Sequence, residues 1–168
     1  MMTETGDLGF EPAVRTAFGF LVEEYGFRVA ASSADRVRFE SSGVYVEITS
    51  GRYGQEVGVE CGRIGTDERF DLQSYLGAAS AGLRDQVGDG IVDTPEAMRH
   101  CTAHLAEVLR AHGQPILEGN PSAFELVSPV SWAHFNLDAI GPAEYRERYR
   151  RELDAARAGL ARLRQGPG

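Results

Sequence analysis

The chain has 168 residues, of which 42% are hydrophobic and 25% charged, so it holds enough apolar material for one folded domain and is not typical of a disordered protein. No run reaches the roughly 18 uncharged apolar residues of a membrane span, and the acidic start, MMTETGDLGFEP, lacks the basic and apolar regions of a signal peptide. We therefore expect a cytoplasmic protein that does not contact membranes.

The net charge of −8 is unevenly distributed along the chain. Residues 1–70 and 71–141 carry −5 and −6, whereas residues 142–168 carry +3. An acidic body repels nucleic acid and attracts a basic protein partner. All seventeen basic residues are arginine, which excludes chemistry that depends on a lysine.

The first predicted element is an amphipathic helix in FEPAVRTAFGFLVEEYGF. Its apolar positions recur at three- and four-residue steps: Val14, Phe18, Leu21, Val22 and Tyr25. Pro12 suits the first turn, and Gly26 followed by Phe27 is typical of a left-handed helix end closed by a hydrophobic contact.

Alternation with a period of two follows the helix, in VRFE, VYVEIT and EVGVECG. The breaks SSG and SGRYG have the length and glycine content of hairpin loops, and FRVAA offers one more strand before them. These patterns predict an antiparallel meander of three or four strands, with one face buried in the core.

The other face of this sheet carries charged and aromatic residues, namely Arg36, Arg38, Glu40, Tyr45, Glu47, Glu56 and Glu60. One interpretation is a solvated face with Arg/Glu pairs between neighbouring strands. The alternative is an acidic docking surface, for which Glu40, Tyr45, Glu47, Glu56 and Glu60 are the candidate partner-binding residues.

Three further helices are expected after the sheet. Asp71 can cap a short one with Leu72 and Tyr75 turned inward, and Thr94 can cap a second that begins at Pro95 and ends at Gly113. A third, long and basic, opens at Pro142. We expect loops for the acidic stretch with Asp85, Asp89 and Asp93 and, between residues 114 and 141, an irregular segment that packs on the body through Phe124, Trp132 and other large apolar residues.

The long helix at residues 142–164 has an apolar stripe made of Tyr145, Tyr149, Leu153, Ala156, Leu160 and Leu163. A helix of about 23 residues is about 35 Å long, more than is needed to cover a core of this size. Two arrangements remain open. Either its second half projects, which would offer Leu160 and Leu163 to a partner or a second copy, or the helix lies flat along the body.

The stretch HCTAH places His100 and His104 one turn apart on the helix that begins at Pro95, close to Glu107. Two histidines and a carboxylate can bind a metal ion. However, Cys101 stands where a zinc protease of this spacing has its glutamate base, and spacing fixes no third ligand. We favour two boundary histidines that carry no metal, and we expect no cofactor. Cys61 and Cys101 lie among apolar neighbours and are expected to be core residues without a disulfide.

The run from Phe18 to Gly62 resembles a small bacterial domain found among predicted immunity proteins of polymorphic toxin systems. The shared features are a helix that ends in Tyr-Gly-Phe and strands of the type VYVEI and EVGVE. The resemblance covers the N-terminal half of the chain and implies a fold and a toxin-neutralising role, without any catalytic residue.

The expected fold class is α+β in a single domain, residues 1–168. It divides into a helix and meander over residues 1–70, helices and a packed irregular segment over 71–141, and the long helix over 142–164. The first functional hypothesis is a non-enzymatic protein that inhibits a basic partner, plausibly a toxin. The alternative is an adaptor or assembly protein that acts through its C-terminal helix, and the third is a metal-dependent enzyme that uses His100 and His104.

Overall fold

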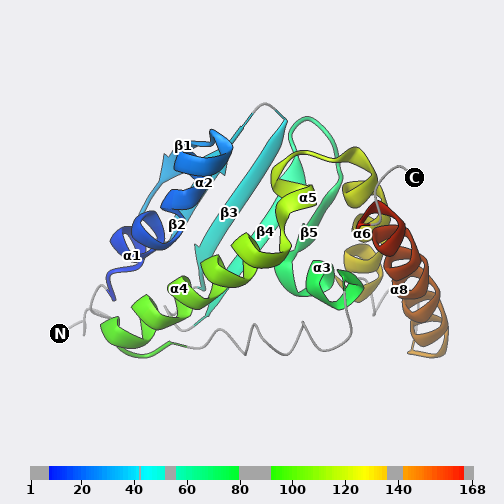
Figure 1. The fold of residues 1–168 in the computed structure, drawn as a ribbon. Coiled ribbons are helices and arrows are strands. Elements are labelled where there is room, and N and C mark those ends of the chain that lie inside the picture. The colour runs from blue at the N-terminus through cyan, green and yellow to red at the C-terminus, as the bar shows by residue number, and fades with distance from the viewer. Residues whose placement is uncertain (1–7, 42, 52–55, 80–91, 136–141, 165–168) are drawn as a thin grey trace.

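Five antiparallel strands form the centre of the computed structural model, and each pairs with the next along the chain (Figure 1). They are β1 (Arg28–Ser32), β2 (Arg36–Glu40), β3 (Val44–Ser50), β4 (Val57–Arg63) and β5 (Arg69–Asp71). The structure describes residues 8–41, 43–51, 56–79, 92–135 and 142–164, without the side chains of 130–135, 142–146 and 163–164. The predicted α+β class and meander are confirmed. The predicted number of strands, three or four, was too low. The fifth strand, β5, has only three residues, too few to show an alternation.

The predicted N-terminal helix is divided in two at Phe18. Its parts are α1 (Phe10–Ala17) and α2 (Gly19–Tyr25), and Phe18 and Leu21 are fully buried. The expected stripe was wrong at Val22, which is 44% exposed. The expected end was correct, since Gly26 adopts a left-handed conformation with φ of 73° and Phe27 is buried beside it.

The helix that follows β5 and the one at Pro95 lie where the sequence places them. Asp71 accepts hydrogen bonds from Ser74 at the start of α3 (Leu72–Ala79). The Thr94 side chain accepts a hydrogen bond from the Ala97 amide, 3.0 Å away, at the start of α4 (Pro95–His112). The predicted loop acids Asp85 and Asp89 lie outside the described residues, and Asp93 is exposed.

The expectation of an irregular segment between residues 114 and 141 was wrong over most of its length. Two helices occupy it, α5 (Gln114–Leu117) and α6 (Pro121–Phe135). Pro115 and Pro121 lie in first turns, and the Asn120 side chain accepts a hydrogen bond from the Ser122 amide, so proline and asparagine begin helices here and do not interrupt them. Residues 136–141 lie outside the description.

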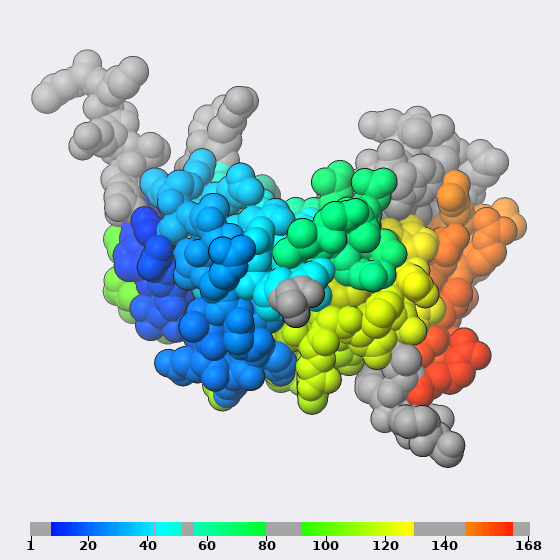
Figure 2. Space-filling view, turned by 90° about the horizontal axis from the view of Figure 1, so that it is seen from above, coloured from blue at the N-terminus to red at the C-terminus, as the bar shows by residue number. Residues whose placement is uncertain are grey.

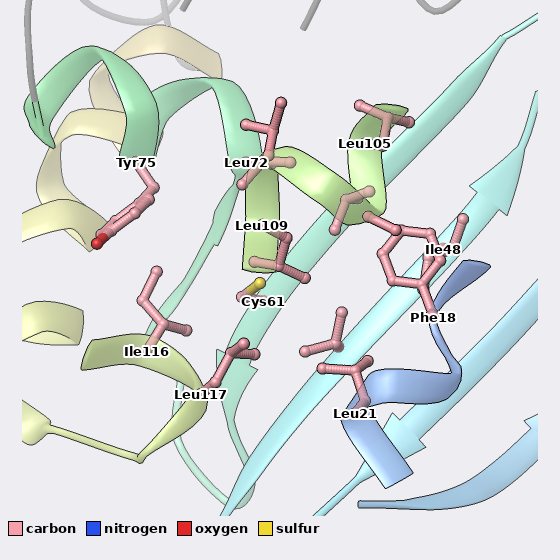
Figure 3. Packing of buried hydrophobic residues seen from close by; sticks show 14 of the residues in the cluster. Phe18, Leu21, Ile48, Cys61, Leu72, Tyr75, Leu105, Leu109, Ile116 and Leu117 are labelled. Carbon is pink, nitrogen blue, oxygen red and sulfur yellow. The ribbon is translucent and has the colours of Figure 1, made fainter. Parts of the chain in front are cut away.

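The inward side chains of the strands and the buried side chains of the helices form one cluster, so the core lies between one face of the sheet and the helices. In Figure 1, α4 and α5 lie in front of the strands. Figure 3 shows Leu105 and Leu109 of α4 and Leu117 of α5 near Ile48 of β3 and Cys61 of β4. Cys61 is fully buried, Cys101 is half-buried, and both are free thiols, as expected from the sequence.

The long C-terminal helix, α8 (Pro142–Arg164), packs on α6 and α3. Figure 2 shows α8 in orange to red at one end of the molecule, with α6 in yellow between it and the strands. No helix in the described part of the chain is both long enough and apolar enough to cross a bilayer.

Candidate binding surface

One face of the sheet carries the buried strand residues, and the other carries a row of charged and aromatic side chains that we call the open face. Strand alternation assigns these outward positions: Arg28, Arg36, Arg38, Glu40, Tyr45, Glu47, Glu60 and Arg69. The structure therefore brings together four of the five predicted binding residues on the sheet. The fifth, Glu56, lies immediately before β4 and is exposed.

Arg38 lies at the centre of the open face and holds two of the predicted glutamates. Its Nε is 2.8 Å from Glu40 Oε1, and its Nη1 is 3.3 Å from Glu47 Oε2 on the neighbouring strand. Burial alone would lower the pKa of Arg38, but the hydrogen bonds to these two carboxylates raise it on balance. Arg36 lies 3.0 Å from Glu47, and Arg28 lies 3.5 Å from Glu40, which extends the network across three strands.

Tyr45 lies beneath Arg38 and is the aromatic centre of the open face. The Arg38 guanidinium carbon is 4.0 Å from the centroid of the tyrosine ring, a distance suited to a cation–π contact. On the neighbouring strand, Gly62 leaves room for the ring, since a Cβ added there would lie 2.5 Å from it. Burial and the charge of Glu60 raise the pKa of Tyr45 to about 12. The ring is thus held between an arginine and the backbone.

Glu60 is the least neutralised carboxylate of the network. Arg69 is its nearest arginine, at 3.8 Å, and the Glu60 side chain is 40% exposed. Burial and the repulsion from Glu47 raise its pKa, although Arg69 and a hydrogen bond from Tyr45 oppose that shift. Negative charge is therefore more available at β4 than around Arg38.

The Arg/Glu pairs expected on this face are present between neighbouring strands. Four arginines (Arg28, Arg36, Arg38, Arg69) stand against five carboxylates, namely the four candidate glutamates (Glu40, Glu47, Glu56, Glu60) and Asp71, which lies opposite Glu60 on β5, so this face is nearly neutral. Part of the acidity of the molecule lies elsewhere. Burial raises the pKa of Tyr25, and the nearby carboxylates of Glu118, which follows α5, and Glu24, in α2, raise it further. Arg110, which forms an ion pair with Glu24, opposes that shift. Sequence reasoning missed this acidic pair because 94 positions separate its members.

The two histidines of HCTAH do not lie at the border of the buried face. The His100 side chain is 82% exposed, with Glu96 as its neighbour at 4.0 Å, and His104 and Glu107 are exposed as well. Thr102 is fully buried, whereas Cys101 is only half-buried. The buried side of α4 is therefore turned toward Thr102 and away from the two histidines. In the part of the chain that the structure describes, no three His, Cys, Asp or Glu side chains gather as metal ligands.

Leu160 is not available to a partner, because it is only 2% exposed. The hypothesis of a projecting second half of α8 was wrong at this position. Ala156 is fully buried, Gly159 packs on Leu126 of α6, and Arg157 donates a hydrogen bond of 2.9 Å to the Gly77 carbonyl of α3. Leu163 and Tyr145 lie outside the residues whose side chains are described.

Comparisons with protein-family models, with curated proteins and with solved structures find no match for this chain.

Proposed function

We propose that the protein binds a basic protein partner through the open face of its sheet and inhibits it by covering its surface, as immunity proteins do with toxins. The N-terminal resemblance suggests this class, and the proposal includes the cytoplasmic location expected from the sequence. No cofactor takes part in it, and no nucleic acid is involved.

The observation that supports the proposal best is the ordered stack of Arg38 on Tyr45. Tyrosine and arginine are enriched among the residues that carry most of the binding energy at interfaces. Here both side chains are held in place before binding, by Glu40, Glu47 and the close approach of Gly62. A partner would therefore lose little side-chain entropy when it docks on them.

Charge supports a basic partner. The net charge of −8 attracts a positively charged protein at long range, and opposite charge increases the association rate more than the affinity. At short range, Glu56 is exposed and Glu60 is weakly paired, so lysine or arginine side chains of a partner can approach β4.

The first candidate partner is the product of the neighbouring gene, because immunity proteins are encoded beside their toxins. Binding is measured by surface plasmon resonance for the parent protein and for Tyr45→Ala and Arg38→Ala. Loss of a packed interface anchor of this type costs about 2 kcal/mol or more, which is at least a 30-fold weaker affinity.

The matched control is Arg150→Ala, an exposed arginine on α8 at the opposite end of the chain. The same partner is also expressed in cells with and without this protein, and co-expression should restore growth if the partner is toxic. A partner that binds the Tyr45→Ala and Arg38→Ala variants as tightly as the parent would refute the role of the open face. A neighbouring gene product that neither binds nor harms cells would contradict the inhibitory role.

A further inference from the structure

A groove lies between α1 and the N-terminal half of α4, two helices that run beside each other (Figure 1). Its volume is about 510 Å³, within the range of about 300–1,000 Å³ that is typical of small-molecule sites. Its walls are small and apolar, with Pro12, Ala13 and Ala17 on α1 and Pro95, Thr102 and Ala103 on α4. The groove does not involve the open face of the sheet.

The polar group at the floor of this groove, the Thr102 hydroxyl, is already hydrogen-bonded within the protein. Thr102 is fully buried, and its single hydroxyl hydrogen is shared between the carbonyls of Met98, at 2.9 Å, and Arg99, at 3.2 Å. Its polar atom is therefore satisfied within α4. Ala13 and Ala17 are only half-buried although they pack against the core. An apolar ligand could cover the part of their surface that water now contacts.

Arg99 gives the groove a positive rim. It is exposed, and no carboxylate of the described residues lies within ion-pairing distance of it. Glu96, three residues before Arg99 on α4, is 4.0 Å from His100. An anionic group at this rim is favoured by the charge of Arg99.

We propose that this groove binds a small amphipathic acid, with its apolar chain between α1 and α4 and its carboxylate against Arg99. The apolar walls select the chain, and the Arg99 guanidinium, which has no ion-pair partner among the described residues, selects the charge. The site is independent of the proposed partner binding, so either proposal can fail without the other.

The test uses hexanoate, octanoate and decanoate as probes, with 1-octanol as the neutral counterpart of octanoate. Calorimetric titration of the full chain should show an affinity that rises about fourfold with each methylene, the equivalent of about 0.8 kcal/mol. Octanoate should bind about tenfold more tightly than 1-octanol, because a hydrogen bond to a charged group is stronger than one to a neutral group.

Two variants separate the roles of charge and shape. Arg99→Gln should abolish the preference for octanoate over 1-octanol while both still bind, and Arg150→Gln on α8 is its matched control. Ala103→Leu should fill the groove and weaken every probe at least tenfold, whereas Ala158→Leu, at an exposed alanine of α8, should have no effect. Both positions tolerate leucine in a helix, so unchanged melting temperatures are expected.

Several results would overturn the proposal. Affinity that does not depend on chain length, or that survives Ala103→Leu, would show that the probes bind elsewhere. Equal binding of octanoate and 1-octanol would remove the selectivity for an acid. Self-association that Ala103→Leu abolishes, without any binding of the probes, would assign the groove to a second copy of the chain.

Discussion

Replacing Leu160 by alanine should destabilise the protein although the residue lies near the end of the chain. The side chain is 2% exposed and belongs to the single core cluster. Removing a buried leucine side chain beyond Cβ costs about 2–5 kcal/mol, and we expect about 3 kcal/mol for this site at the periphery of the core. For a chain of this length, each kcal/mol lowers the melting temperature by about 2–4 °C, which gives a fall of about 6–12 °C. Alanine forms helices at least as well as leucine, so loss of packing is the cause.

The assay is urea denaturation of the parent and of two variants, Leu160→Ala and Leu153→Ala. Leu153 is half-buried on the same helix, so its truncation should cost less. The slope of the transition should not change, because the extent of unfolding is the same. Analytical ultracentrifugation should show the same mass for all three proteins. A loss below about 1 kcal/mol at Leu160, accompanied by altered association, would contradict the packing of α8 described above and return Leu160 to a partner interface.

Four further outcomes are expected. Thr94→Ala should cost about 1 kcal/mol in urea denaturation by removing the side-chain cap of α4, whereas Thr94→Ser should not. Gly62→Ala should cost about 1–3 kcal/mol, because the new Cβ would meet the Tyr45 ring. The folded state favours the neutral form of Tyr45, because its pKa is raised to about 12. The stability that this preference contributes is complete below pH 10 and is lost as the pH rises to about 12. The Tyr45→Phe variant should not show this loss. Thiol reagents should label Cys101 and not Cys61 in the native protein, since burial raises the pKa of the Cys61 thiol and shields it.

Helices and strands whose boundaries are marked by capping, proline or glycine residues could be predicted from the sequence. Helix α4 begins at Pro95 after the Thr94 cap and ends before Gly113, as the sequence indicates. The meander was predictable because strand alternation in VYVEIT and EVGVECG places one set of side chains in the core. In each case a few adjacent residues carry the information, and tertiary contacts only reinforce it.

Helix α6 was missed because proline and asparagine mark both loops and helix starts. The residues after Pro121 decide between these possibilities. The buried positions Ala123, Phe124 and Val127 have helical spacing, so a signal was present in the sequence. Pro129 within the helix obscured it, because proline usually ends a helix.

The composition of the open face and the presence of Arg/Glu pairs were predictable, but the partner of each residue was not. Alternation alone places Arg38, Glu47 and Tyr45 on one face. The register of β2 against β3 puts Arg38 opposite Glu47, and the stack on Tyr45 depends on which rotamers the three side chains adopt. The burial of Leu160 could not be inferred either, since it depends on how closely α8 approaches α6.

The near neutrality of the open face has a kinetic consequence for the proposed partner. Long-range attraction depends on the total charge of −8, including carboxylates away from this face such as Glu24 and Glu118, whereas short-range contacts depend on Tyr45 and Arg38. Glu118→Gln should therefore slow association and weaken its salt dependence, because screening acts over about 8 Å at physiological ionic strength. Tyr45→Ala should leave the association rate nearly unchanged and accelerate dissociation. If both variants changed only the dissociation rate, the two surfaces would act as one contact area, and the separation of steering from docking would be wrong.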